Sequence, residues 1–323
     1  MPTVLAVDGN SLAHRAWHAL IDERDSGPWL AGGVVRMLGS VWRYGRYAGV
    51  VVAFDAPDSI RKARHPGYKA SRPTPDPAFV GQLRNLAHLL AACGFTVLST
   101  PGHEADDLLA ATVAGAGIAD VRTTLVSSDR DLLALVSDRA TLLRPRRTMA
   151  DLAVYDPAAV RAEFGVEPTQ YLELAALRGD PSDDLPGVPG VGQRTAARLL
   201  RSWGSVGALY AGIRDLPPDL AARLRDSRGD VERNLELMAP LAQAPVDLAA
   251  TLANGVDLAE VRRVLAPVGL GPAADAFRRA VERGPLPPMP PPPLEPPPGT
   301  AAADPPAPRA PLHLDGIQAA LFS

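Results

Sequence analysis

The stretch Gly102-His103-Glu104-Ala105-Asp106-Asp107 is the centre of the fold prediction. Three carboxylates in four residues stand directly before the apolar residues 108–113. A helix dipole favours acidic residues in the first turn by about 0.3–1 kcal/mol each, so a helix is predicted to begin here. Helix capping alone would explain these charges. Related acidic stretches elsewhere in the chain favour a shared site instead.

Acidic residues follow each of four short apolar runs, at residues 3–7, 49–54, 95–98 and 123–126. We interpret these runs as strands, with residues 141–143 as a candidate fifth, and residues between them recur at helical spacing. Alternating strands and helices predict an α/β fold with a parallel sheet, whose strands all end at one edge. The acidic residues expected at that edge are Asp8, Asp55, Glu104, Asp106, Asp107, Asp129 and Asp131.

So many carboxylates in one crevice would repel one another, and divalent cations would remove the repulsion. Oxygen ligands select hard ions, so Mg²⁺ is expected, with Mn²⁺ as a substitute. Mg²⁺ usually keeps several waters, so this set exceeds the need of one ion. Two ions about 3.5–4 Å apart, as in phosphoryl-transfer enzymes, would use it. A single Asp after a strand is more often a turn or cap residue, but recurrence at four strand ends favours a site.

A basic segment lies between the second and third predicted strands. Residues 61–72 carry five positive charges and no acid, and flanking prolines interrupt them. We expect a mobile segment over the sheet edge, because it emerges directly after Asp55. Its charges suit a phosphate backbone, and Tyr68 is available to stack on a base. A solvated charged face is the alternative interpretation.

The overall composition sets broad limits. The chain has 323 residues, of which 46% are hydrophobic, as in a globular protein. A net charge of -3 predicts no strong overall attraction to nucleic acid, although an acidic site and a basic strip would cancel in this sum. The single Cys93 excludes an internal disulfide and a thiolate metal cage. No apolar run approaches the ~20 residues of a membrane span, so we expect a soluble, cytoplasmic protein.

Helical patterns replace strand patterns after Tyr155. A helix is predicted at residues 168–177 and another at 193–203, with glycines at 187, 190 and 192 between them. Free N–H groups in such a hairpin, together with the next helix N-terminus, form an anion site. The string at residues 187–200 matches the helix-hairpin-helix motif, which grips a DNA phosphate backbone without reading its sequence.

The composition changes again at Gly284. Residues 285–311 are rich in proline and have few apolar side chains, so they are expected to form an extended, disordered linker. Residues 312–323 end the chain with the apolar Leu321 and Phe322. They are either a frayed terminus or a docking peptide.

Together these motifs resemble the 5′ nuclease family. That family includes the N-terminal domain of bacterial DNA polymerase I, free-standing bacterial 5′-3′ exonucleases and, more distantly, flap endonucleases. The resemblance runs in order over residues 1–282. It is carried by Val7-Asp8-Gly9 with Leu12 and Arg15, Phe54-Asp55, Gly67-Tyr68-Lys69 with Arg72, Pro101-Gly102, Glu104-Ala105-Asp106-Asp107, Ser128-Asp129-Arg130-Asp131-Leu132, and the segment from Gly179-Asp180 to Thr195-Ala196.

The resemblance implies a specific domain organisation. Residues 1–160 would form a PIN-like parallel sheet flanked by helices, with a helical arch at about 57–80. Residues 161–283 would form a helical DNA-binding domain with its helix-hairpin-helix at 179–203. The linker at 284–311 and the docking peptide at 312–323 would follow.

The resemblance also implies roles for individual residues. Asp8, Asp55, Glu104 and Asp106 correspond to ligands of a first metal, and Asp107, Asp129, Asp131 and Asp183, with Asp180 nearby, to a second cluster. Lys69 and Arg72 correspond to arch residues at the scissile phosphate, with Arg61 assisting. A K⁺-bridged hairpin and further DNA contacts would involve Arg15, Arg64, Tyr68, Gly187, Val188, Gly190, Val191, Gly192, Arg194 and Thr195. Asp184 stands where the family usually has Asn, and His14 where it often has Tyr.

The implied function is structure-selective 5′-3′ exonuclease or flap endonuclease cleavage of DNA by two metals. The substrate would be DNA with a 5′ end, flap or nick, or an RNA–DNA hybrid, cut by a nucleoid-associated monomer in replication and repair. The alternatives are a nuclease-inactive DNA-junction scaffold and a PIN-type ribonuclease, which would leave the hairpin domain unexplained.

The C-terminal peptide resembles a known docking motif. Gln318, Leu321 and Phe322 fit the Gln-x-x-Leu-Phe peptide by which bacterial replication and repair proteins bind the sliding clamp. The resemblance therefore implies a clamp partner at the end of the linker, against the alternative of a frayed tail.

Overall fold

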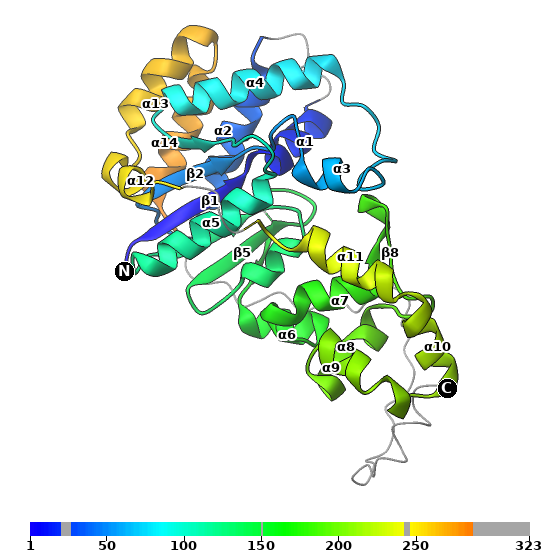
Figure 1. The fold of residues 1–323 in the computed structure, drawn as a ribbon. Coiled ribbons are helices and arrows are strands. Elements are labelled where there is room, and N and C mark those ends of the chain that lie inside the picture. Colours follow the sequence, from blue (N-terminus) through cyan, green and yellow to red (C-terminus); the bar gives the residue numbers. More distant parts are fainter. Residues whose placement is uncertain (21–26, 150, 242–245, 287–323) are drawn as a thin grey trace, which may run out of the picture.

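The computed structural model describes residues 1–20, 27–149, 151–241 and 246–286. An α/β part and a smaller helical part lie side by side in it (Figure 1). All but the first three residues of the predicted linker, and the whole docking peptide with Gln318, Leu321 and Phe322, lie outside the described residues.

A six-stranded sheet runs through the α/β part in the order β3-β2-β1-β4-β5-β6. The strands are β1 (Thr3–Asp8), β2 (Gly49–Ala53), β3 (Thr96–Leu98), β4 (Arg122–Val126), β5 (Ala140–Pro145) and β6 (Leu152–Tyr155). The first five are parallel, which confirms the predicted fold class and the candidate fifth strand. β6 was not predicted; it returns after a short connection and therefore pairs antiparallel with β5.

Helices cover both faces of the sheet because side chains alternate along each strand. Leu5 and Val7 lie in one core with α1 (Gly9–Ala19), α2 (Trp29–Val41) and α4 (Pro77–Ala92). Val4 and Ala6 face the other side, in cores that include residues of α5 (Ala105–Ile118). All four side chains are fully buried. The acidic residues after the strands are thereby left at the carboxyl edge, beyond the packed layers.

The helical part contains the predicted helix-hairpin-helix. Its helices are α6 (Pro157–Phe164), α7 (Tyr171–Arg178), α8 (Gln193–Trp203), α9 (Val206–Ala211), α10 (Pro218–Asp226) and α11 (Arg228–Met238). Two strands of two residues each, β7 (Gly179–Asp180) and β8 (Leu185–Pro186), pair between α7 and α8 and were not predicted. They are too short to leave a periodic pattern in the sequence.

The last three helices pack against the α/β part, whereas the sequence-based expectation groups them with the helical domain at 161–283. They are α12 (Leu248–Asn254), α13 (Leu258–Leu265) and α14 (Gly271–Arg283). Phe277 of α14 is buried beside Trp42 in the core that contains α2, and Leu248 of α12 packs in the core of Val51. Figure 1 shows α13 and α14 beside α2 and α4. The sequence predicts a helical domain in this region but does not identify the surface that these helices cover.

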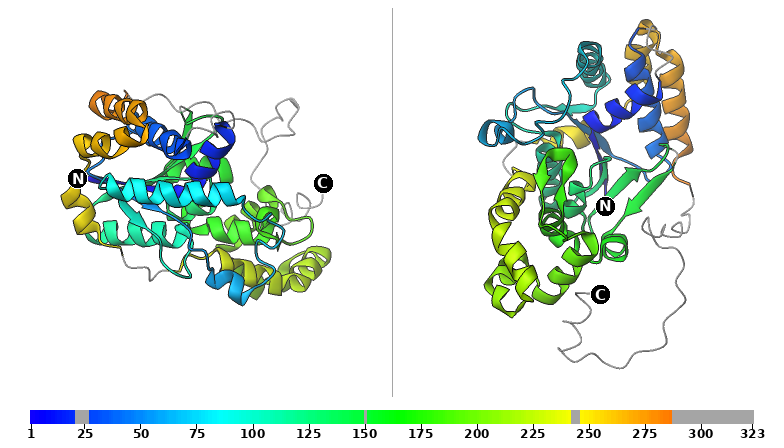
Figure 2. Two further views of the ribbon diagram at one scale, coloured as in Figure 1. Left: turned by 90° about the horizontal axis from the view of Figure 1, so that it is seen from above. Right: turned by 90° about the vertical axis from the view of Figure 1, so that its right-hand side faces the viewer.

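Two further views show the α/β layers and the helical part from above and from one side (Figure 2). Within the described ranges, no helix has both the length and the apolar character needed to cross a membrane.

The hairpin between α7 and α8 depends on close backbone contact at Gly187. A Cβ placed there would lie 2.2 Å from the carbonyl carbon and oxygen of Arg178. We expect Gly187→Ala to lower the free energy of unfolding by about 1–3 kcal/mol, because backbone atoms cannot move aside as a flexible side chain can. Gly81→Ala, in open space on α4, is the control and should be neutral or stabilising. Chemical unfolding of both variants measures this, and equal stabilities would contradict the expectation.

Candidate active site

Asp8 ends β1 and lies at the junction of two strands. Its Oδ1 accepts a hydrogen bond from the Ser11 backbone N–H at 2.8 Å, which caps α1. Its Oδ2 accepts one from the Ser127 hydroxyl at 2.6 Å. Ser127 follows β4, the neighbour of β1 in the sheet. The parallel topology therefore holds this buried carboxylate between two strand ends.

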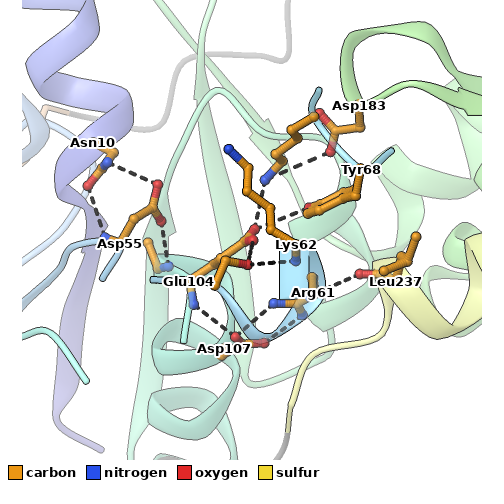
Figure 3. A network of polar contacts seen from close by, with 12 residues as sticks. Asn10, Asp55, Arg61, Lys62, Tyr68, Glu104, Asp107, Asp183 and Leu237 are labelled. Carbon is orange, nitrogen blue, oxygen red and sulfur yellow. Dashed lines mark hydrogen bonds and ion pairs between the residues drawn. The ribbon is translucent and has the colours of Figure 1, made fainter. Parts of the chain in front are cut away.

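Asp55 follows β2 and connects the sheet edge to α5. Asn10 donates from Nδ2 to Asp55 Oδ2 at 3.0 Å and accepts from the Asp55 backbone N–H at 3.1 Å. Asp55 Oδ1 accepts from the backbone N–H of Ala105, the first residue of α5, at 2.8 Å. Figure 3 shows Asp55 between Asn10 and the start of this helix. These bonds fix the carboxylate next to the Glu104–Asp107 turn.

Glu104 is surrounded by donors. Its carboxylate accepts hydrogen bonds from the Ser59 hydroxyl at 2.7 Å, the Tyr68 hydroxyl at 3.1 Å and Lys69 Nζ at 2.7 Å. Burial raises the pKa of Glu104, but the Lys69 charge and the hydrogen bonds from Lys69 and Ser59 lower it by a larger amount. The pKa of Glu104 therefore lies below its usual value. Glu104 therefore remains ionised although it is buried.

Four more carboxylates face one another across a pocket of about 420 Å³. Asp129 and Asp131 follow β4, and Asp129 Oδ1 accepts from the Asp131 backbone N–H at 2.8 Å. Asp180 is the last residue of β7, and Asp183 lies in the turn between β7 and β8. The pocket is thus built by the α/β part on one side and the helical part on the other.

Burial and mutual repulsion raise the pKa values of several carboxylates, and three of them are shifted furthest. Burial is the main cause that raises the pKa of Asp8 to about 7 and of Asp131 to about 8, and it raises the pKa of Asp106 well above its usual value. The charge of Asp129 adds to all three shifts. Asp129 therefore lies within electrostatic range of both groups of carboxylates, one around Asp106 and one around Asp131.

The donor chemistry of these groups fits a hard divalent cation. The ligands available are all carboxylate oxygens, and a cation would relieve the repulsion that raises their pKa values. Within the described part of the chain, no three His, Cys, Asp or Glu side chains already converge on a ready-made ion position. Basic side chains contact the carboxylates instead.

The basic segment supplies these side chains. It forms the short helix α3 (Ile60–Arg64) and then a series of turns at the sheet edge. Lys69 adopts a left-handed backbone conformation with φ of 52°, and its backbone N–H donates to the Asp183 carbonyl at 3.0 Å. Lys69 Nζ lies 3.9 Å from the Asp183 carboxylate as well as in contact with Glu104, and Arg72 forms an ion pair with Asp183. Lys69 thus links the carboxylates of Glu104 and Asp183, and Arg72 binds Asp183.

Two family models match consecutive parts of the chain. The model of the 5′-3′ exonuclease N-terminal resolvase-like domain matches residues 3–165, and that of the 5′-3′ exonuclease C-terminal SAM fold matches residues 166–259. The chain belongs to the 5′-3′ exonuclease family. This family match identifies the fold, which has its carboxylates at one edge of the sheet, as a nuclease fold.

Bacterial DNA polymerases I are similar to this chain in sequence. DNA polymerase I of Mycobacterium bovis is 40% identical over 255 residues, which cover 76% of this chain and 28% of that protein. The thermostable DNA polymerase I of Thermus thermophilus is 35% identical over 265 residues, covering 80% of this chain and 30% of that protein. The exonuclease chain therefore spans less than a third of the length of these relatives.

Solved structures share the fold. The T5 D15 protein co-crystallised with metal ions has a TM-score of 0.60 at 22% identity, covering 87% of this chain and 98% of that one. The catalytic core of Rad2 in complex with a DNA substrate has a TM-score of 0.55 at 15% identity, covering 86% and 91%. The PIN-like α/β architecture with a second helical part is thus common to all three.

Asp107 does not join the carboxylates of this 5′-3′ exonuclease, contrary to its predicted place in the second cluster. It is fully buried and pairs with Arg61, whose Nη1 and Nη2 donate to its two oxygens at 2.8 and 2.7 Å. The backbone N–H groups of Glu104 and Leu241 donate to the same oxygens at 3.0 and 2.7 Å. Each oxygen accepts two hydrogen bonds, so neither has a lone pair free for a cation. Arg61, predicted to assist at the phosphate, is likewise buried.

Tyr68 and Arg15 also differ from their predicted roles. Tyr68 is buried and its hydroxyl donates to Glu104, so its ring is not available to stack on a base. Arg15 donates to the carbonyls of Pro145, Arg146 and Arg147, which fixes it on the turn after β5. Tyr68 is directed into the site, and the half-buried Arg15 is held on this turn.

The hairpin between α7 and α8 exposes backbone groups, and its valine side chains are buried. Val188 and Val191 are buried, and Val191 N–H donates to the Val188 carbonyl at 2.9 Å. Gly190 has a positive φ of 73°, which favours glycine, and Gly192 caps α8 without a side chain. Arg194 is exposed and Thr195 half-buried in the first turn of α8. The exonuclease thus leaves the start of α8 open, as an anion site requires.

Several residues of the site were missed in the sequence. Asn10, Ser11, Ser59 and Ser127 orient carboxylates, but small polar residues near turns are too common to be identified without the fold. Arg144 and Arg178 line the pocket, and each donates through Nε to a backbone carbonyl, those of Ser128 and Gly179. Only the tertiary structure brings these arginines next to Asp131.

The raised pKa values predict an unusual pH dependence of stability for the metal-free exonuclease. Asp8 and Asp131 bind protons more tightly in the folded chain, near pH 7 and 8, than at their usual value of 3.8. The folded state therefore holds more protons, and the free energy of unfolding falls from pH 5 to 8.5, by at most about 1.4 kcal/mol per pH unit for each group.

Thermal unfolding in EDTA measures this dependence. Mg²⁺ should raise the melting temperature most above pH 7, where the carboxylates are ionised, and Asp8→Asn should flatten the metal-free curve. A melting temperature that rises with pH in EDTA over this range would contradict the assignment.

Proposed function

We propose that the protein hydrolyses DNA phosphodiesters at 5′ ends and 5′ flaps, using two divalent ions, in replication and repair. One observation carries the proposal: two groups of carboxylates, from the sheet edge and the β7–β8 turn, meet beneath a basic segment that touches both. Membership of the 5′-3′ exonuclease family supports the same chemistry.

The residues that we propose to hold the ions are those implied by the family resemblance, without Asp107. Asp8, Asp55, Glu104 and Asp106 would hold the first ion, and Asp129, Asp131, Asp180 and Asp183 the second. Mg²⁺ is the expected ion and Mn²⁺ its substitute. Bound ions would activate water and offset the negative charge that develops on the phosphate.

Lys69 and Arg72 would position that phosphate. Lys69 lies between Glu104 and Asp183, Arg72 pairs with Asp183, and both side chains carry donors from which a phosphate oxygen can accept hydrogen bonds. A phosphate entering between them would exchange the contacts to Glu104 and Asp183 for contacts to its own oxygens. The cations would then lower the repulsion between DNA and the carboxylates.

The helical part would hold the duplex beyond the cut. The backbone of the hairpin, the open start of α8 and the exposed Arg194 favour a phosphate contact independent of base sequence. The hairpin would also hold a K⁺ ion in this proposal, and the exposed Arg64 of the basic segment would add a contact to DNA. The solved complexes of T5 D15 and Rad2 with DNA support a nucleic-acid substrate.

Asp106 provides the direct test of the metal-dependent step. Asp106→Asn should reduce Mg²⁺-dependent cleavage of a 5′-flap substrate by at least about 100-fold, because a carboxylate ligand is lost while the fold is retained. Duplex affinity in Ca²⁺ should change little. Cleavage of labelled flaps and binding by fluorescence anisotropy measure the two, with exposed Asp151→Asn as control. Retained cleavage by Asp106→Asn would refute the proposed site.

Lys69 tests the basic segment. Lys69→Ala should lower the single-turnover rate by about 100-fold, as expected when a charged donor to the reacting group is removed. Lys62→Ala, an exposed lysine of α3, is the matched control and should have a much smaller effect. An unchanged rate for Lys69→Ala would exclude the segment from catalysis.

The substrate class separates the remaining candidates. Cleavage of flap, nicked and blunt DNA is compared with cleavage of single-stranded RNA, in Mg²⁺ and in Mn²⁺. A DNA flap should be cut fastest, leaving a 5′-phosphate and a 3′-hydroxyl. Preference for single-stranded RNA would favour a ribonuclease, and junction binding without any cleavage would favour a scaffold.

A further inference from the structure

Arg61 and Asp107 form a buried ion pair that the catalytic groups do not use. Arg61 is 6% exposed and Asp107 fully buried. Burial raises the pKa of Asp107, but the hydrogen bonds from Arg61 and from the Leu241 backbone outweigh it, and the pKa is lowered overall. Both side chains of the pair are therefore charged although they are buried.

The pair joins the two parts of the molecule. Arg61 Nε donates to the Leu237 carbonyl at 2.7 Å, and its Nη2 donates to the Ala239 carbonyl at 2.9 Å. Asp107 accepts from the Leu241 backbone N–H. Leu237, Ala239 and Leu241 belong to the last turn of α11 and the segment after it. In Figure 3, Arg61 lies between Asp107 and Leu237.

The pair also fixes two segments that contact Glu104. Arg61 lies on α3, directly after Ser59 and Ile60, and Ser59 donates to Glu104. Asp107 lies in the first turn of α5 and accepts from the Glu104 backbone N–H. One ion pair thus fixes the start of α3, the start of α5 and the end of α11 relative to one another.

Asp107 faces away from the other carboxylates. A small cavity beside the pair is lined by Arg61, Glu104, Asp106, Asp129, Asp131 and Asp183, but not by Asp107. Asp106 and Asp107 are adjacent on α5 and point to different environments. Asp106 meets the carboxylates, and Asp107 meets the arginine.

We infer that the Arg61–Asp107 ion pair is an interdomain positioning device that sets the geometry of Glu104 and Asp106, and that Asp107 is not a metal ligand. This inference rests on the proposed function for the identity of the site it positions. It follows from the saturated oxygens of Asp107 and from the three segments that meet at the pair. Arg61 and Asp107 are positioning residues, because neither touches the reacting atoms.

Binding of Mn²⁺ to the full chain, measured by electron paramagnetic resonance, tests the inference. Asp107→Asn should bind as many Mn²⁺ ions as the unmodified chain, with affinity reduced about 10-fold or more, as is usual when a group that orients ligands is lost. Arg61→Gln should weaken Mn²⁺ binding similarly, although arginine offers a cation no ligand. Asp106→Asn should bind one ion fewer.

Two further variants extend the test in case Asp107→Asn or Arg61→Gln impairs folding. Arg61→Lys retains the charge but loses the paired hydrogen bonds, and it should give an intermediate loss of Mn²⁺ affinity. Arg161→Gln breaks the exposed Arg161–Glu167 pair and should leave Mn²⁺ binding unchanged. Thermal unfolding of each variant verifies that it is folded.

Two outcomes would overturn the inference. One is that Asp107→Asn loses a Mn²⁺ ion as Asp106→Asn does, which would make Asp107 a ligand. The other is that Arg61→Gln binds Mn²⁺ with unchanged affinity. Failure of the unmodified chain to cut DNA would overturn the proposed function alone, because the Mn²⁺ comparison does not depend on cleavage.

Discussion

Repulsion between carboxylates at the carboxyl edge of the sheet is the constraint on which the site depends. Parallel strands bring Asp8, Asp55 and Asp129 to the same edge, and the turn between β7 and β8 adds further negative charge across the pocket. Burial raises the cost of each charge. Such a group persists only if protons, basic side chains or cations compensate it; burial favours the protonated forms of Asp8 and Asp131, and Lys69 and Arg72 supply positive charge.

The basic segment and the helical part are held in place by different kinds of contact. Arg72 is half-exposed in its ion pair with Asp183, which can exchange with other anions, whereas Lys69 and Glu104 form a largely buried pair. Arg61 and Asp107 make a buried pair, and removing one partner of such a pair costs about 3–5 kcal/mol because the other charge remains unpaired. The Arg72–Asp183 pair lines the pocket, and the Arg61–Asp107 pair lies behind it. This arrangement allows a phosphate to enter without loosening the carboxylates.

The corrections to the predicted site share one cause. Asp107, Arg61, Tyr68 and Arg15 all have the residue types that bind metals or DNA, but each bonds to a neighbouring group of the chain, and the first three are buried. Residue type and spacing identify what a side chain can bind. They do not identify which neighbour is nearest after folding, and a buried arginine and an exposed arginine look the same in a sequence.

The sequence alone determined the α/β fold class, because apolar runs alternate with helical patterns along the whole first half of the chain. It determined the strand-end position of Asp8, Asp55 and Asp129, since a parallel topology leaves those residues no other edge. It also determined the hairpin before α8, through its glycines. The tertiary structure decided that α12–α14 return to α2, that Asp106 and Asp107 point to different environments, and that Ser127 and Asn10 orient carboxylates. Those choices depend on which surfaces pack together, and one-dimensional patterns contain no information about the partner.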